Sequence, residues 1–117
     1  MSGLTTHVLD VAAGVPARGV RIELYALDKA TPQLLTTMLT NEDGRCPQPL
    51  LDAASMKPGR YLLSFHVADY FRARGLELPE PPFIDEVQIH FGIAATDQHY
   101  HVPLLVSPWS YSTYRGS

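Results

Sequence analysis

The amino-acid sequence predicts an all-β protein, a sandwich of short strands with one small helix. Several segments alternate apolar and polar side chains with a period of two, the pattern of a strand that buries one face. Ten prolines and eight glycines are spread along the 117 residues and divide the chain into short segments, as turns between strands do. About seven or eight strands in a chain of this length are typical of a β-sandwich.

Each expected strand is placed by its alternation and by the turn residues that flank it. In chain order, the expected strands are residues 5–11, 19–27, 34–40, 61–67, 85–93, 99–106 and 111–115. The second, fourth and fifth of these are the most regular, because every second residue from Val20, Tyr61 and Val87 onward is apolar. The other four follow the same pattern less regularly.

Turns and one helix are expected between the strands. Residues 41–44 read Asn-Glu-Asp-Gly, in which the Asn and Asp side chains can bond to their own backbone and Gly44 can adopt a positive φ. Residues 52–56 are compatible with one helical turn. Residues 68–74 can form a short helix, which Gly75 would close at its C-terminus.

Composition and charge limit the classes of function. The chain, residues 1–117, has the length of one domain, and its 45% hydrophobic and 18% charged residues are typical of a globular protein. The net charge of −3, without a cluster of lysines and arginines, argues against nucleic acid as a partner. No apolar run reaches the roughly 20 residues that cross a bilayer, so we expect no membrane partner.

The chain ends and the single cysteine bear on location. The N-terminus lacks the basic and apolar regions of a signal peptide, and the C-terminus is no peroxisomal Ser-Lys-Leu-type signal. Cys46 has no second cysteine to pair with, and a buried, unreactive thiol is its better interpretation. We therefore expect a cytoplasmic protein.

Histidines are the first candidates for chemistry. His99 and His101 lie two apart on an expected strand, so both rings project from one face, while the opposite face has the character of core. The histidine face could line a cleft or a subunit contact, or the two residues could be plain surface histidines on an edge strand. A zinc site formed by His7, His99 and His101 is a further alternative, because three imidazoles and a water make a catalytic zinc centre.

The remaining histidines and two common catalytic motifs give no further candidates for chemistry. His66 and His90 lie opposite the apolar residues of their strands, and we interpret both as non-catalytic surface or interface residues. No glycine-rich phosphate loop follows a strand, which argues against nucleotide hydrolysis. A Gly-x-Ser-x-Gly elbow is absent too, which removes the α/β-hydrolase mechanism.

Both ends of the chain resemble a known family. The run His-Val-Leu-Asp at residues 7–10 and the segment 14–17 resemble the amino-terminal signature of transthyretin and its relatives. The run His-Tyr-His-Val-Pro-Leu-Leu-Val-Ser-Pro at residues 99–108 resembles their carboxy-terminal signature. The resemblance extends over essentially the whole chain.

The ending resembles one branch of that family. A terminal Tyr-Arg-Gly-Ser, present here at residues 114–117, marks the 5-hydroxyisourate hydrolases and is absent from the hormone-carrying transthyretins. The carriers also have lysine, glutamate and threonine where this chain has His7, Arg45 and His101. The sequence therefore resembles the hydrolases more than the carriers.

The resemblance implies an architecture and a site. The fold would be a transthyretin-like, or prealbumin-like, sandwich of two four-stranded sheets with one short helix. Four chains would form a homotetramer, a dimer of dimers, around a central channel. The catalytic residues His7, Arg45, His101 and Ser117 would converge in that channel. Three of them, His7, Arg45 and Ser117, would also bind substrate.

Three further residues have supporting roles under the same resemblance. Tyr114 would belong to the substrate-binding set, and with Arg115 it would fix the C-terminal tail. His99 and Arg115 would contact and orient the catalytic residues rather than act on the substrate.

The implied activity is the hydrolysis of a small molecule, 5-hydroxyisourate, in urate breakdown. Water would add to the C6 carbonyl and the N1–C6 bond of the six-membered ring would break, giving 2-oxo-4-hydroxy-4-carboxy-5-ureidoimidazoline. His7 and His101 would bracket the water, one of them acting as general base, and Arg45 would hold the substrate's oxygens. No cofactor or metal is expected. A non-enzymatic carrier of small ligands, of the transthyretin type, is the alternative function.

Overall fold

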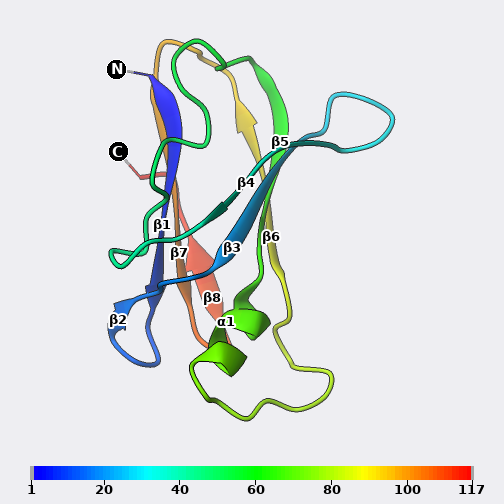
Figure 1. Cartoon of the computed structure of the whole chain (residues 1–117). Helices are drawn as coiled ribbons and strands as arrows, with labels where there is room; N and C mark the ends of the chain where they lie inside the picture. Colours follow the sequence, from blue (N-terminus) through cyan, green and yellow to red (C-terminus); the bar gives the residue numbers. More distant parts are fainter. Residues whose placement is uncertain (1, 117) are drawn as a thin grey trace.

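Two sheets face each other and enclose the hydrophobic core (Figure 1). The computed structural model describes residues 2–116. The strands are β1 (Gly3–Asp10), β2 (Val15–Pro16), β3 (Arg21–Ala26), β4 (Gln33–Leu39), β5 (Gly59–Phe65), β6 (Val87–Ile93), β7 (His99–Val106) and β8 (Tyr111–Thr113), and the helix α1 (Val67–Ala73) follows β5. One four-stranded sheet has the order β2-β1-β7-β8, and the other has the order β4-β3-β5-β6. The expected sandwich of two four-stranded sheets with one short helix is confirmed.

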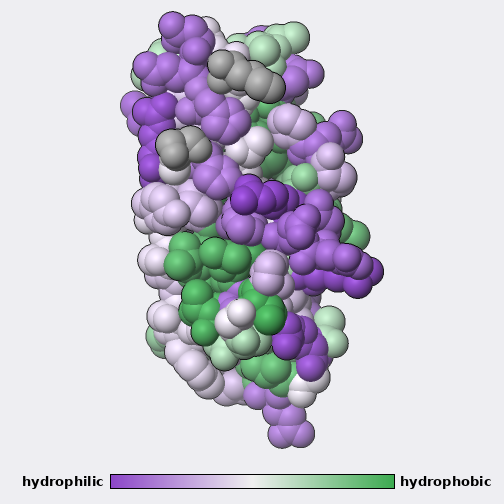
Figure 2. All heavy atoms as spheres, turned by 90° about the vertical axis from the view of Figure 1, so that its left-hand side faces the viewer, coloured by the Kyte–Doolittle hydropathy of each residue, from purple (hydrophilic) through white to green (hydrophobic). Residues whose placement is uncertain are grey.

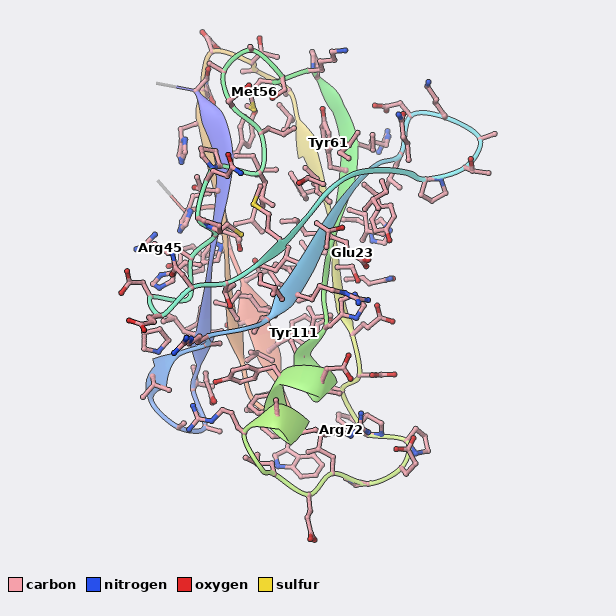
Figure 3. The ribbon with its side chains drawn as sticks, viewed as in Figure 1. Glu23, Arg45, Met56, Tyr61, Arg72 and Tyr111 are labelled. Atoms are coloured by element: carbon pink, nitrogen blue, oxygen red, sulfur yellow. The ribbon has the colours of Figure 1, made fainter. Side chains whose placement is uncertain are left out.

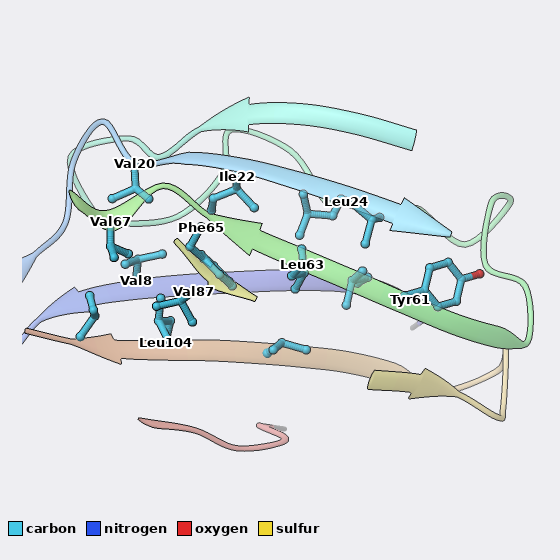
Figure 4. Close-up of a cluster of buried hydrophobic side chains, with 14 of the residues drawn as sticks. Val8, Val20, Ile22, Leu24, Tyr61, Leu63, Phe65, Val67, Val87 and Leu104 are labelled. Atoms are coloured by element: carbon cyan, nitrogen blue, oxygen red, sulfur yellow. The ribbon is translucent and has the colours of Figure 1, made fainter. Parts of the chain in front are cut away.

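The core lies between the sheets and is built from the alternating residues of both (Figure 4). Val20, Ile22 and Leu24 on and beside β3 are completely buried, as the period of two predicts. Val8 of β1 and Leu104 of β7 meet them from the opposite sheet. Every one of these apolar side chains therefore stabilises the contact between sheets.

The expected strands lie within two residues of the observed ones at each end, and two differences have a physical reason. β2 was not expected, because two residues are too few to display a period. β8 ends at Thr113 rather than at residue 115, and the partner that Tyr114 would need on β7 is Pro103. Proline has no N–H to donate, and the Pro103 carbonyl accepts a hydrogen bond of 2.7 Å from the Thr113 hydroxyl instead. The ladder stops there and the tail leaves the sheet.

Helix α1 covers one end of the sandwich (Figure 1). Its residues Val67, Tyr70 and Phe71 are buried. The helix starts and ends one residue earlier than expected, and Gly75 follows the C-cap with φ +93°, a conformation that suits glycine. Within residues 2–116, no helix has the length and apolar character needed to cross a membrane.

A buried carboxylate joins α1 to the end of β1. Asp10 is only 2% exposed, and its side chain accepts hydrogen bonds from the Tyr70 hydroxyl at 2.9 Å and from the Ala13 backbone at 3.0 Å. The Arg74 guanidinium lies 3.7 Å away. Because each oxygen has a partner, this buried charge fixes the helix against the β1–β2 turn.

The fold predicts that Leu63 is a major contributor to stability. Leu63 is completely buried in the core, so replacing it by alanine should lower the free energy of unfolding by about 2–5 kcal/mol. Leu34 on β4 is 51% exposed, and Leu34→Ala is a control that should change stability by about 0.5 kcal/mol or less. Urea unfolding of both variants measures the difference. Equal effects would contradict this description of the core.

Candidate active site

The pairing of β1 with β7 gathers the candidate histidines. The two strands run parallel, with Gly3 opposite His99 and Thr5 opposite His101. Because successive side chains point to opposite faces of a sheet, Thr5, His7, His99 and His101 project together from the outer face. The neighbouring Leu4 and Tyr100 point into the core. The sequence predicts that His99 and His101 share a face, and the structure places them so.

The hydroxyl of Thr5 links two of these rings. Its Oγ1 lies 2.8 Å from His101 Nδ1 and 3.0 Å from His99 Nε2. His99 and His101 are both half-buried. The two imidazoles therefore have one shared hydrogen-bonding partner, contributed by the neighbouring strand.

His7 is held by the turn before Arg45. His7 and Arg45 face each other as an isolated antiparallel bridge, and His7 Nε2–H donates a hydrogen bond of 2.7 Å to the Asp43 carbonyl oxygen. A carbonyl can only accept, so the proton of a neutral His7 is on Nε2. Nδ1 of that ring is then an acceptor, available to a water or a substrate.

Gly44 makes the close approach of this turn to β1 possible. The Asn41 side-chain oxygen accepts from the backbone N–H groups of Asp43 and Arg45 at 2.9 and 3.2 Å, as expected for this turn sequence. Gly44 has φ +76°, and a Cβ at this position would collide with the carbonyl oxygen of Val8. The turn therefore places Arg45 beside His7 only because residue 44 is glycine.

The electrostatic surroundings favour a neutral His101. Burial lowers the pKa of His101, and the positive charge of Arg45 lowers it further. Charges on His7 and His99 act in the same direction, while a hydrogen bond to the Thr5 backbone opposes them. A neutral imidazole at neutral pH can accept a proton, as a general base must.

A small cavity is lined by Arg45 and by Thr5, the residue that bonds to His99 and His101. It has a volume of about 250 Å³ and lies between β1, at Thr5 and Thr6, and the segment that runs from Arg45 to Pro49. Figure 3 shows Arg45 on the outer side of β1, and its side chain is exposed. A small polar molecule in this cavity would have a cationic group at its rim.

Cys46 also lines the cavity, but its thiol is not a nucleophile. Cys46 is half-buried, and burial raises its pKa to about 11. Because the thiolate is the reactive form, almost none of it is present at neutral pH. The expectation of an unreactive thiol agrees with this environment.

Arg115 anchors the C-terminal tail. Its guanidinium stacks over the Tyr100 ring at 4.1 Å from the ring centroid, a cation–π contact. It also donates hydrogen bonds to the Gln98 side chain at 3.0 Å and to the His99 carbonyl at 3.3 Å. The tail is thereby fixed to the start of β7, next to the histidines.

The end of the tail lies against His101. The Gly116 N–H donates to the His101 carbonyl oxygen at 2.7 Å, and a Cβ at Gly116 would lie 2.7 Å from His101 Cδ2. Only glycine allows so close an approach. Ser117, a predicted catalytic residue, lies outside the described residues. Tyr114 lines a different hollow, of about 400 Å³, at the edge of the sandwich between β6 and β8.

The outer face that carries the histidines is largely hydrophilic, with a hydrophobic patch towards the β2 end (Figure 2). Val11 and Val15, at that end of the sheet, are 50% and 39% exposed. The polar part of the face therefore coincides with the part where the turn and the tail meet β1 and β7.

A different cluster has the geometry that could hold a metal ion. Within residues 2–116, the one group of His, Cys, Asp and Glu with ligand atoms within 4.8 Å of one another is Glu23, His66 and Glu86, on the other sheet. His66 Nε2 lies 2.9 Å from Glu23 and 3.5 Å from Glu86, and the Arg21 guanidinium lies 3.3 Å from it. This arrangement is an ion-pair network, and only 12% of the His66 side chain is exposed, less than expected for a surface residue.

Of the predicted site residues in the described part of the chain, Tyr114 lies apart, at the hollow between β6 and β8. His7, Arg45, His99 and His101 lie together, and Arg115 adjoins them through its contact with His99. The zinc alternative required His7, His99 and His101 to converge, and in the described part of the chain they do not form a ligand cluster.

Thr5 was not among the residues predicted from the sequence. Its position two residues before His7 indicates the same face of the strand, and that signal was available. The missing information was that β7 is the neighbour of β1 and that Thr5 lies opposite His101.

Comparison with known proteins gives consistent matches over the chain. The model of the HIUase/Transthyretin family matches residues 4–116. The 5-hydroxyisourate hydrolase of Pseudomonas aeruginosa is 58% identical over 117 residues, which cover 100% of this chain and 93% of the relative.

Solved structures agree. The structure of the Klebsiella pneumoniae 5-hydroxyisourate hydrolase superimposes with a TM-score of 0.83 at 36% identity, covering 100% of both chains. Sea bream transthyretin in complex with thyroxine has a TM-score of 0.85 at 24% identity, covering 97% of this chain and 93% of that one. The second likeness shows the fold alone.

Replacing Gly44 by alanine should disturb the site through the backbone. The φ of +76° costs about 1–3 kcal/mol with a side chain, and the collision with Val8 adds to this cost. Gly19→Ala is the matched control, because Gly19 has φ +84° but no atom within 4 Å of the point that a Cβ would occupy. Thermal unfolding should show a larger loss for Gly44→Ala. If both variants lose equal stability, the close contact with β1 is unimportant.

Proposed function

The chain belongs to the HIUase/Transthyretin family, and from this premise we propose that it is an enzyme that hydrolyses 5-hydroxyisourate. The names of its relatives support the substrate. The observation that carries the proposal is the grouping of His7, Arg45 and His101 on one face of the sheet, where Arg45 also lines a small cavity.

The proposed reaction opens the six-membered ring. A water molecule loses a proton and adds to the C6 carbonyl, and the N1–C6 bond breaks as N1 takes up a proton. The product is 2-oxo-4-hydroxy-4-carboxy-5-ureidoimidazoline. The chain's own residues must therefore accept one proton, return it, and stabilise the negative charge that develops at the carbonyl oxygen.

His7 and His101 have different proposed roles towards the attacking water. His7 keeps its proton on Nε2 through the Asp43 carbonyl, which leaves Nδ1 to accept a hydrogen bond. His101 has a lowered pKa and is neutral at neutral pH, which suits the role of general base. A positioned base of this kind contributes about 10²–10⁴-fold in rate.

Arg45 supplies positive charge. Its guanidinium always carries charge and offers a fork of donors to the substrate's oxygens. Stabilisation of developing negative charge by such fixed donors is often the largest contribution to catalysis. The exposed position of Arg45 at the rim of the cavity supports this role.

The tail completes the proposed site. Ser117 would orient the substrate or a histidine, and the contact of Gly116 with His101 supports a tail that ends there. Tyr114 and Arg115 line the hollow at the sandwich edge. This position supports a role of Tyr114 in fixing the tail rather than in direct contact with the substrate. His99 supports His101 through Thr5.

A homotetramer is part of the proposal. In the described chain β6 and β8 are edge strands, and an edge offers unpaired N–H and C=O groups to another strand. Tyr111 and Tyr114, beside that edge, are 49% and 60% exposed, which supports pairing with a second copy of the chain. A cytoplasmic location and independence of metal also belong to the proposal.

A carrier of small ligands is the second candidate, since sea bream transthyretin with the same fold holds thyroxine. Fold alone does not decide between carrier and enzyme. The grouping of two histidines and an arginine on one face of the sheet favours the enzyme.

An assay of substrate decay tests the function. Purified protein added to 5-hydroxyisourate, freshly generated by urate oxidase, should accelerate the ultraviolet decay, with and without a chelator. His101→Asn should reduce kcat/KM by about 10²–10⁴-fold, and Arg45→Gln should also reduce it strongly. His90→Asn and Arg60→Gln are controls on the other sheet and should leave the activity unchanged.

Size-exclusion chromatography of all variants checks that assembly is retained. Wild-type protein without any effect on the decay would favour the carrier. A loss of activity with the chelator, restored by metal, would reject metal independence.

The environment of His101 predicts a shifted titration. Because the Arg45 charge lowers the pKa of His101, Arg45→Gln should raise that pKa, and the neutral base should disappear at higher pH than in the wild type. Titration of the His101 ring by NMR measures this even in an inactive variant. Arg60→Gln is the matched control, with no effect expected. If the pKa of His101 in Arg45→Gln equals that in the wild type, the Arg45 guanidinium does not act on the His101 ring.

A further inference from the structure

We propose that Thr5 is a positioning residue, whose hydroxyl fixes the tautomer of His101 and is itself oriented by His99. The inference rests on the proposed hydrolysis for its catalytic consequence, but the tautomer is a property of the protein alone. It deepens the proposal by assigning the proton of His101 to one of its two nitrogens.

The Thr5 hydroxyl has fewer protons than it has ring nitrogens within reach. A hydroxyl has one proton to donate, and Thr5 Oγ1 lies within hydrogen-bond distance of two ring nitrogens, His101 Nδ1 at 2.8 Å and His99 Nε2 at 3.0 Å. With both rings neutral, Thr5 either donates to one nitrogen and accepts from the other, or accepts from both, because a hydroxyl oxygen has two acceptor lone pairs. At most one of the two nitrogens can accept from Thr5, so their protonation states are coupled.

Of these arrangements, the one with the proton of His101 on Nδ1 fits the proposed reaction. Thr5 Oγ1 occupies Nδ1 at 2.8 Å, so Nε2 is the ring nitrogen available to water, and it can act as a base only when it carries no proton. The Nδ1–H then donates to the Thr5 hydroxyl, and the hydroxyl donates its own proton to His99 Nε2. Under this arrangement His99 carries its own proton on Nδ1.

This tautomer leaves His101 Nε2 as the base. Nε2 accepts a proton from the attacking water as the oxygen forms its bond to C6. The same proton goes to N1 when the N1–C6 bond breaks, so His101 ends as it began. Nδ1–H stays bonded to Thr5 throughout, as the partner of a catalytic histidine's second nitrogen does in other hydrolases.

The position of Thr5 makes the hydroxyl separable from the fold. Thr5 lies on the outer face of β1, opposite His101, and its side chain is not part of the core cluster. Valine has the same branched shape and a high preference for strands. Thr5→Val therefore removes the hydroxyl while the strand and its register are kept.

The experiment compares three variants in the full-length protein. Thr5→Val removes the hydroxyl, Thr5→Ser keeps it, and Thr37→Val is a matched control on the exposed side of β4. Two-dimensional ¹⁵N–¹H spectra of the histidine rings report which nitrogen of His101 carries the proton. Spectra of His101→Asn and His99→Asn assign the signals.

The wild type should show the Nδ1–H tautomer of His101, and Thr5→Val should shift it towards Nε2–H, the form that a free histidine side chain prefers. In the decay assay kcat of Thr5→Val should fall about 10–100-fold, with a smaller change in KM. Thr5→Ser should restore both the tautomer and kcat, and Thr37→Val should match the wild type in every measurement.

Two results would overturn the inference. One is an Nδ1–H tautomer and normal kcat in Thr5→Val. The other is Thr5→Ser as impaired as Thr5→Val, since packing of the methyl group would then be the cause. If the wild type fails to hydrolyse 5-hydroxyisourate, the proposed function is lost, while the tautomer measurement still decides whether Thr5 positions His101.

Discussion

The parallel pairing of β1 with β7 is the constraint on which the site depends. It brings the two ends of the chain together and sets Thr5 opposite His101, with Gly3 opposite His99. A shift of register by one residue would turn the polar face of one strand towards the core. The buried residues Val8 and Leu104, which also pair in this register, oppose such a shift. Packing energy in the core thus fixes the geometry of polar groups on the outside.

Two segments from elsewhere in the chain are added to this pair of strands, and each is brought there by backbone contacts. The turn before Arg45 bonds to β1 through the Gly44 carbonyl, which accepts from Val8 at 2.8 Å. The tail bonds to β7 through Gly116. Both contacts need glycine, because a Cβ would meet Val8 in the first case and His101 in the second. The functional side chains next to these glycines are therefore positioned by main-chain hydrogen bonds rather than by their own contacts.

The alternation of apolar and polar residues along the sequence predicted those strands that depend only on the burial of one face. The alternation around Val20 and Val87 reflects burial of one strand face, and the structure confirms both strands. The end of β8 depends on which residue faces Tyr114 across the sheet, and the sequence does not state that this partner is Pro103. The role of Thr5 was missed for the same reason. The grouping of His7, Arg45 and His101 was expected only from the resemblance to a family, since nothing in their spacing implies that they meet.

Two histidines of this chain show how surroundings decide what an imidazole can do. His66 lies between two carboxylates and an arginine, and its hydrogen bond lowers the pKa of Glu23, so the charges compensate one another in a structural network. Within residues 2–116, the groups that shift the pKa of His101 include no carboxylate, and burial and the Arg45 cation hold it neutral. A neutral imidazole beside a guanidinium is suited to take a proton from water next to an anionic intermediate. The same residue type is therefore a structural group on one sheet and the best candidate for a base on the other.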